Sequence, residues 1–206
     1  ADRRLLDWNV DALVKVWVTE IVINCAHLSR VFLETIPEYY RGAHIAFSVE
    51  GETYGESLET KGGIVYALSK LSPSGEPFIV CAGDVVSGFD FKTLAAREKQ
   101  FSQDKTAAHL VLVPNPEFNL AGDMGLRDGR VVPNEKTYTY GGIGLFAREI
   151  FDNEPAVFSK LFPWLLTFAK DGRVSGELFD GPWHNVGTPD VLQNLAAELA
   201  LEGLYP

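Results

Sequence analysis

One acidic side chain stands where an apolar segment of the sequence ends. The run Val80-Cys81-Ala82-Gly83 leads directly into Asp84, which predicts a buried strand that ends on a carboxylate. Ligands of open parallel sheets bind beyond the carboxyl ends of the strands, so a carboxylate at this place suits a metal ion or a sugar hydroxyl. The alternative is structural, because an Asp at a strand end also caps the turn that follows.

Two glycine-containing motifs could offer backbone groups to a ligand. Gly62 and Gly63 stand at the start of a predicted helix, where exposed N–H groups and missing side chains suit a nucleotide base, a ribose or a phosphate. An ordinary helix start capped by Thr60 is the alternative. In residues 140–144, glycines interrupt a predicted strand, which indicates either a close approach of a ligand or a β-bulge.

A further group of polar residues lies near the carboxyl end of the chain. Ser175-Gly176-Glu177 is followed by residues 183–188, in which His184 and Asn185 end a short apolar strand directly before a helix cap. Either side chain of this pair could face a site, although ordinary solvent exposure is the favoured explanation for His184. The sequence shows no Ser-His-Asp spacing, no Walker A loop and no Cys-rich metal motif.

Composition limits the class of protein. The 206 residues are 46% hydrophobic and carry a net charge of −10, which argues against a general nucleic-acid binder but not against an anionic substrate bound through a divalent metal. The cysteines, Cys25 and Cys81, lie in apolar runs and predict no disulfide scaffold. No apolar run approaches the ~20 residues of a membrane span, and no signal peptide is visible, so we expect a cytoplasmic protein without a membrane or nucleic-acid partner.

The order of apolar segments predicts the fold class. Strand-like and helix-like segments alternate, which is typical of an α/β fold with a Rossmann-like, mostly parallel sheet and helices on both faces. A small antiparallel excursion is expected where Asp128-Gly129 joins residues 124–127 to residues 130–132 as a hairpin. The expected strands are residues 19–24, 44–49, 80–84, 109–113, 138–146, 174–179 and 183–186. The expected helices are residues 6–17, 31–36, 62–71, 91–101, 157–168 and one that begins at residue 188.

Taken in order, these segments resemble the sugar-1-phosphate nucleotidyltransferases, and most of all the short bacterial uridylyltransferases that act on N-acetylmuramic acid 1-phosphate. The matching stretches are residues 19–24, 58–63, 83–85, 122–126, 140–143, 175–177 and 183–188. The resemblance implies a Mg²⁺-dependent transferase that joins a nucleoside triphosphate, UTP or dTTP, to a sugar 1-phosphate and releases pyrophosphate. It implies UMP transfer to N-acetylmuramic acid 1-phosphate in nucleotide-sugar biosynthesis and peptidoglycan recycling.

The resemblance also assigns roles to individual residues. It makes Asp84 the catalytic residue and first Mg²⁺ ligand, and it places Asn185 where most of the family has a second Asp. An amide oxygen is a neutral ligand, so we expect weaker metal binding than two carboxylates would give. The substrate-binding positions that it implies are Glu59, Gly62 and Gly63 for the base, Gly142 and Glu177 for the sugar, and Asp123 near the sugar side.

One departure from the family pattern concerns the start of the chain. The family's Gly-rich signature, G-x-G-x-R-x-x-P, and the first strand of its sheet do not occur in these 206 residues, so we expect a single nucleotidyltransferase domain that lacks both. A non-catalytic module that binds a nucleotide sugar is therefore the alternative function. A metal-dependent glycosyltransferase is disfavoured because Val86, and not a second Asp, follows two residues after Asp84. The sequence does not indicate an oligomeric state.

Overall fold

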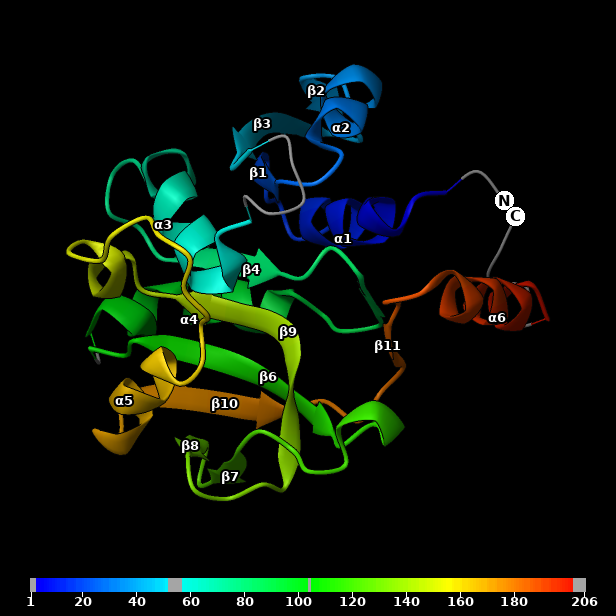
Figure 1. Ribbon diagram of the computed structural model, residues 1–206. Coiled ribbons are helices and arrows are strands. Elements are labelled where there is room, and N and C mark those ends of the chain that lie inside the picture. Colours follow the sequence, from blue (N-terminus) through cyan, green and yellow to red (C-terminus); the bar gives the residue numbers. More distant parts are fainter. Residues whose placement is uncertain (1–2, 52–56, 104, 202–206) are drawn as a thin grey trace.

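The computed structural model describes residues 3–51, 57–103 and 105–201, which form one layered α/β body (Figure 1). Its helices are α1 (Leu5–Val14), α2 (Ser29–Thr35), α3 (Glu59–Leu71), α4 (Lys92–Gln103), α5 (Trp164–Lys170) and α6 (Pro189–Leu201). Its strands are β1 (Glu20–Cys25), β2 (Tyr39–Tyr40), β3 (Ala43–Val49), β4 (Phe78–Cys81), β5 (Val85–Ser87), β6 (Ala108–Pro114), β7 (Gly125–Arg127), β8 (Arg130–Val132), β9 (Tyr138–Phe146), β10 (Val174–Leu178) and β11 (Trp183–Asn185). Short 3-10 turns occupy Glu117–Asn119 and Arg148–Phe151.

The strands of the described residues form three sheets. The largest has the order β4-β9-β6-β10-β8-β7, a second has the order β1-β3-β2, and β11 pairs with β5. Only the pairs β1–β3 and β6–β10 are parallel among the described strand pairs. The α/β class is therefore confirmed, whereas the prediction of a mostly parallel sheet is wrong.

The position of β9 explains this difference. This nine-residue strand lies antiparallel between β4 and β6 and pairs with both. An apolar run buried on both faces looks the same in sequence whichever direction it has, so the alternation of helices and strands did not reveal its direction. The antiparallel hairpin before it was predicted correctly: β7 pairs with β8 through a turn in which Asp128 and Gly129 have positive φ angles of 49° and 72°.

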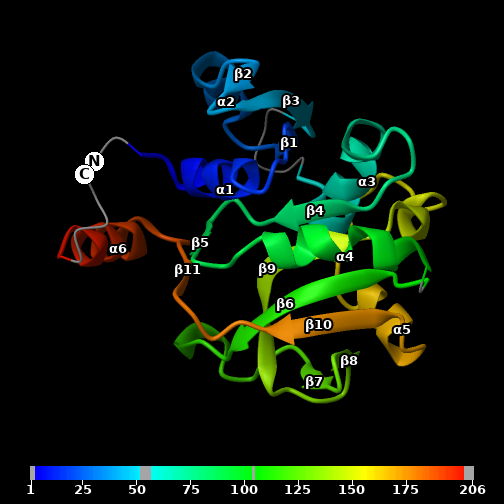
Figure 2. The ribbon, with the colours of Figure 1, turned by 180° about the vertical axis from the view of Figure 1, so that it is seen from behind.

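Helices cover both faces of the large sheet. Figure 1 shows α5 on the near face, and the reverse view in Figure 2 shows α4 on the other. At the centre, Leu110, Val111 and Leu112 of β6 are completely buried. Such a strand, buried on both faces, is expected when helices pack on each side of a sheet. No helix in the described part of the chain has the length and apolar character needed to cross a membrane.

The helix predicted for residues 157–168 is shorter than expected. Helix α5 begins only at Trp164, directly after Pro163, and it ends at Lys170. The residue before a proline disfavours helical backbone angles, so Phe162 cannot continue a helix into Pro163. The apolar side chains before Pro163 still pack inward: Leu161 is 3% exposed, and the Phe162 ring lies 5.5 Å from that of Tyr140.

An aromatic cluster packs α5 against the large sheet. Phe151 is fully buried, and its ring centroid lies 5.9 Å from Phe78, 6.2 Å from Phe146 and 5.2 Å from Trp164. Rings at these distances combine buried apolar area with favourable edge and offset contacts. Phe151 therefore links β4, β9 and α5.

We expect Phe151→Ala to lower the free energy of unfolding by about 3–5 kcal/mol, because it removes the ring at the centre of this cluster and leaves a cavity. Urea denaturation followed by fluorescence measures the change. Phe158→Ala is the matched control: the Phe158 side chain is 64% exposed, so its loss should cost less than about 1 kcal/mol. Equal losses for the two variants would contradict the packing described here.

Candidate functional site

Pairing of two short strands brings Asp84 and Asn185 together. We predicted that Asp84 is the last residue of its strand. Strand β4 instead ends at Cys81, and Asp84 lies in the turn that leads into β5. Strand β11 pairs antiparallel with β5, and Asn185 is the partner of Val85. The main-chain oxygen of Asp84 accepts a hydrogen bond from the N–H of Val186 at 2.7 Å. Residues 101 positions apart in sequence thus become neighbours.

Neither of the two side chains has a structural bonding partner among the described residues. Asp84 is exposed and Asn185 is partly exposed, and neither side chain forms a hydrogen bond or an ion pair with another described residue. A carboxylate oxygen and an amide oxygen are the hard donors that Mg²⁺ accepts. In the described ranges no three His, Cys, Asp or Glu side chains cluster as a metal site. The Asp84 carboxylate and the Asn185 amide oxygen are therefore candidate groups for holding Mg²⁺.

A buried side chain on α1 holds the turn that carries Asp84. The amide nitrogen of Asn9 donates to the carbonyl oxygens of Ala82 at 3.1 Å and Val85 at 3.2 Å, and Asn9 is only 4% exposed. A buried amide is stable when its donors are satisfied, as they are here. Sequence reasoning missed this residue, although a polar side chain on the apolar face of the first helix was a signal for it.

Gly142 lies directly beneath the same turn. Its φ angle is +74°, and a Cβ atom added there would lie 3.0 Å from the Cβ of Ala82 and 3.1 Å from Cγ2 of Val85. Its carbonyl oxygen also accepts a hydrogen bond from the N–H of Ala82 at 2.8 Å. The register of β9 against β6 shifts next to this position, so the bulge that we considered for the glycine motif is present. Gly142 thus lets the main chain approach the Asp84 turn closely.

The glycines of α3 serve close packing. The helix begins at Glu59, earlier than predicted, and Glu59 itself has a positive φ of 61°. The N–H of Gly62, which we expected to be open to a ligand, donates to the carbonyl oxygen of Ser159 at 3.1 Å. A side chain at Gly62 would overlap the Val157 carbonyl. The sequence could not show this contact because its partner is almost 100 residues away.

Gly63 packs against a polar pair instead. A side chain there would overlap the Asn24 amide and the Glu50 carboxylate, which hydrogen-bond each other at 2.5 Å. Asn24 stands near the end of β1, and Glu50 follows β3. Glu59, Gly63 and this pair are among the residues that line a large cavity.

Lys61 is a buried residue that the sequence analysis did not single out. It is 7% exposed, forms an ion pair with Glu154, and lies with its Nζ 4.9 Å from the centre of the Trp164 ring. A buried ammonium needs such a partner because burial without one is costly. Its role is to fix the start of α3 to the loop before α5.

Asp123 is engaged on both carboxylate oxygens. Oδ1 accepts a hydrogen bond from the Asn119 side chain at 3.0 Å, and Oδ2 accepts one from the main-chain N–H of Tyr140 at 2.9 Å. Asp123 is therefore tied to the start of β9, two residues before Gly142. Asp123 would therefore affect the binding of a sugar only indirectly, by positioning β9.

Glu177 belongs to a polar group beneath α4. Its Oε1 accepts a hydrogen bond from Nε2 of the buried His109 at 3.0 Å, and the Arg97 Nε of α4 lies 3.7 Å away. The Nδ1 atom of His109 contacts the Ser175 hydroxyl at 2.7 Å. The hydrogen bond from His109 holds the pKa of Glu177 below its usual value, against the opposing effect of burial. These contacts do not link Glu177 to Asp84 or Asn185.

Comparison with known proteins decides the family. No family model matches the chain. The N-acetylmuramate alpha-1-phosphate uridylyltransferase of Neisseria meningitidis serogroup B is 37% identical over 194 residues, which cover 91% of this chain and 81% of that protein. The chain belongs to the sugar-1-phosphate nucleotidyltransferase family.

More distant members of this family agree. Mannose-1-phosphate guanyltransferase 2 of Candida glabrata is 27% identical over 203 residues, and the chain spans about half of its length (91% of this chain, 54% of the relative). A solved structure from Bacillus anthracis, assigned to the glucose-1-phosphate thymidylyltransferases, superposes with a TM-score of 0.74 at 16% identity, over 94% of this chain and 81% of that one. At this identity the superposition supports the nucleotidyltransferase fold alone.

The lowered pKa of Glu177 predicts how the free energy of unfolding changes at acidic pH. A carboxyl group whose pKa is lower in the folded state than its usual 4.5 stabilises the fold above that pH, and the contribution is lost as the pH falls further. Glu177→Gln should therefore flatten the pH dependence of the unfolding free energy between about pH 5 and pH 3. Urea denaturation across this range measures it.

Glu149→Gln is the control for this experiment. Glu149 forms an ion pair with Arg173 at 3.3 Å, but its side chain is 65% exposed, and surface pairs of this kind contribute little. The control should keep the acid slope of the unaltered protein. If both variants kept that slope, the hydrogen bond from His109 would not stabilise the charged carboxylate.

Proposed function

We propose that the protein transfers UMP from UTP to N-acetylmuramic acid 1-phosphate, giving the UDP-sugar and pyrophosphate, with Mg²⁺ bound at Asp84 and Asn185. The main support for the substrates is the 37% identity to the Neisseria meningitidis uridylyltransferase over most of both chains. The support for the cation is that the side-chain oxygens of Asp84, in the turn before β5, and of Asn185 on β11 have no hydrogen-bond partner among the described residues. UTP and dTTP present the same imide edge, so dTTP is the competing nucleotide. A cytoplasmic role in peptidoglycan recycling is part of the same proposal.

The reaction needs positioning and charge compensation more than covalent help. An oxygen of the sugar phosphate attacks the α-phosphorus of the triphosphate in line, and pyrophosphate leaves from the opposite side. When bound, Mg²⁺ would neutralise phosphate charge and polarise the reacting phosphoryl group. The carboxylate of Asp84 and the amide oxygen of Asn185 would hold that ion. Asn9 and Gly142 would keep the Asp84 turn in place through the contacts described above.

Asn185 changes the electrostatics of this pair. With an amide in place of a carboxylate, the two side chains together carry a formal charge of −1 rather than −2. The attraction between the protein and a divalent cation is correspondingly weaker. Metal binding should therefore depend strongly on the triphosphate, which brings its own negative oxygens to the ion.

The remaining residues divide between the two substrates in this proposal. The nucleotide side comprises Glu59, Gly62 and Gly63. Glu59 and Gly63 line the large cavity, and Gly62 holds α3 in place through its hydrogen bond to Ser159. Gly142 belongs to the sugar side, and Asp123 and Glu177 support that side through β9 and β10.

A non-catalytic module that binds a nucleotide sugar is the second candidate. The observation that favours it is the neutral Asn185, since a binding protein does not need strong metal coordination. Calorimetry with UDP-N-acetylmuramic acid, set beside a pyrophosphate-release assay on the full polypeptide with UTP, Mg²⁺ and a panel of sugar 1-phosphates, separates the two. Pyrophosphate release with N-acetylmuramic acid 1-phosphate supports the enzyme; tight binding without turnover on any sugar supports the module.

Replacing Asp84 removes the charged half of the proposed metal site. We expect Asp84→Asn to lower kcat for pyrophosphate release on the order of 100-fold or more, because the charge that stabilises the transition state is lost with the metal. The exposed Asp90→Asn is the matched control and should retain activity. Unchanged turnover in Asp84→Asn at saturating Mg²⁺ would remove Asp84 from the mechanism.

Introducing a second carboxylate at residue 185 should strengthen Mg²⁺ binding. We expect Asn185→Asp to lower the Mg²⁺ concentration needed for half-maximal activity by about 10-fold, because a second negative ligand strengthens the attraction to the cation. Mg²⁺ titrations of the rate at fixed UTP measure this. His184→Gln, one residue earlier on β11, should leave the titration unchanged. An unaltered Mg²⁺ requirement in Asn185→Asp would show that residue 185 does not contact the ion.

A further inference from the structure

A second cavity, of about 220 Å³, lies between α4 and the turn that joins β7 to β8. The polar side chains that line it are Arg97 of α4, Thr106 ahead of β6, Asp128 and Arg130 at the turn, and Ser175 of β10. The cavity is smaller than the roughly 300–1,000 Å³ of sites for drug-sized ligands, so it suits a small polar ligand. We call it the α4–turn pocket.

The α4–turn pocket lies away from Asp84 and Asn185. Strand β10 begins at Val174, one residue before Ser175, and the chain continues to β11 only after β10 has ended at Leu178. In Figure 2 the arrowhead of β10 points toward β11, and β8 lies near the tail of that arrow. The pocket is therefore at the amino end of β10, whereas Asn185 is reached from its carboxyl end.

Three side chains of this pocket carry hydrogen-bond donors without partners. The Arg130 side chain forms no hydrogen bond or ion pair with another described residue. The Nε of Arg97 is buried without a hydrogen-bond partner in the described part of the chain, and the Glu177 carboxylate lies 3.7 Å from it. The hydroxyl of Thr106, a residue only 6% exposed, forms no hydrogen bond with a described group either. Buried donors are seldom unpaired in folded proteins, so we expect a ligand that accepts hydrogen bonds.

The charge of the pocket differs in sign from that of the whole protein. Two arginines and one aspartate give the described lining residues a net formal charge of +1, whereas the chain carries −10. Guanidinium groups bind oxyanions through N–H donors held in a fixed, planar arrangement. The ligand that fits these donors best is therefore a small oxyanion.

Two acceptors in the same pocket restrict which oxyanion fits. Because Nε2 of His109 donates to Glu177, Nδ1 of the neutral ring accepts a hydrogen bond from the Ser175 hydroxyl, at 2.7 Å. The Ser175 oxygen therefore has only lone pairs left to present to the pocket. The Asp128 carboxylate forms no hydrogen bond with another described residue and is also an acceptor. An anion bound here must donate one hydrogen bond as well as accept several.

We propose that the α4–turn pocket binds inorganic phosphate in the form of hydrogen phosphate. Arg97, Arg130 and Thr106 donate hydrogen bonds to its unprotonated oxygens. Its P–O–H group donates to the Asp128 carboxylate, beside the lone pairs of Ser175. The bound ion ties α4 to the β7–β8 turn. The proposal does not depend on the catalytic proposal.

The P–O–H group separates inorganic phosphate from two similar anions. Sulfate has the same tetrahedral shape but no proton near neutral pH, so it would lie against the Asp128 carboxylate without a hydrogen bond. The second pKa of an alkyl phosphate is about 6, so at pH 8 a phosphate monoester is also without a P–O–H group. Inorganic phosphate keeps one P–O–H group at this pH. Sites built around a hydrogen bond strongly reject analogues that lack it.

Isothermal titration calorimetry of the 206-residue protein at pH 8 and constant ionic strength tests this selectivity. We expect one phosphate to bind per chain, at least about 10-fold more tightly than sulfate or glycerol 3-phosphate. The absence of measurable phosphate binding would overturn the proposal. Sulfate or glycerol 3-phosphate bound as tightly as phosphate would overturn it too, because the ligand would then not be recognised by its P–O–H group.

Arg130→Gln tests whether phosphate occupies this pocket. It should weaken phosphate binding by about 10-fold, because a charge-assisted hydrogen bond is lost. Arg127→Gln is the matched control: it removes the same charge from the same hairpin, but Arg127 is exposed, pairs with Glu135 and does not line the pocket. Its phosphate affinity should stay within about 2-fold of the unaltered protein. Equal affinities in the two variants would mean that phosphate binds elsewhere, and the proposal would be wrong.

Asp128→Asn tests the acceptor of the P–O–H group. Asn tolerates the positive φ of 49° at this exposed position, so the variant should fold, and circular dichroism checks that it does. Without the carboxylate, sulfate is no longer repelled, and its affinity should come within about 2-fold of that of phosphate. If the variant still prefers phosphate as strongly as the unaltered protein, Asp128 does not read the proton and the proposed site is refuted.

Discussion

The candidate site depends on the antiparallel pairing of β5 with β11. The hydrogen bond from the Val186 N–H to the Asp84 carbonyl, with the pairing of Val85 and Asn185, makes Asp84 and Asn185 neighbours along the main chain. Neither side chain forms a hydrogen bond with another described residue, so both are candidate ligand-binding groups. Because the two strands have only three residues each, other contacts must hold them in place.

Those contacts come from three separate elements. Asn9 of α1 binds the carbonyls on both sides of the Asp84 turn, Gly142 of β9 allows the turn to sit against the sheet, and the Trp183 side chain donates to the carbonyl oxygen of Gly141 at 2.9 Å. Buried amide and indole groups are stable only with such partners, so each contact both satisfies a polar group and positions the turn. The site is thus assembled where α1, β9 and β11 meet.

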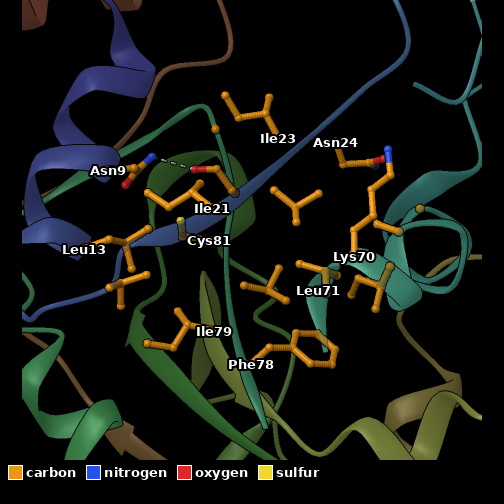
Figure 3. Close-up of a pocket in the computed structure, with 18 of the residues that line it drawn as sticks. Asn9, Leu13, Ile21, Ile23, Asn24, Lys70, Leu71, Phe78, Ile79 and Cys81 are labelled. Carbon is orange, nitrogen blue, oxygen red and sulfur yellow. Dashed lines mark hydrogen bonds between the residues drawn. The ribbon is translucent and has the colours of Figure 1, made fainter. Parts of the chain in front are cut away.

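Two strands of different sheets each have one unpaired edge among the described residues. Strand β1 pairs only with β3 and strand β4 only with β9, and both strands line a cavity of about 1140 Å³. Ile21 of β1 and Ile79 of β4 lie at this cavity (Figure 3). The cavity therefore separates the small sheet from the large one.

The sequence by itself determined the α/β class, the family and the β7–β8 hairpin, because these depend on local patterns of apolar, turn and motif residues. It did not determine the direction of β9, the late start of α5 or the uses of Gly62, Asp123 and Glu177. Only the tertiary structure decided these, since their partners are Ser159, Tyr140 and His109, residues distant in sequence. Local composition sets which segments become strands and helices; which polar groups remain unpaired is settled by packing.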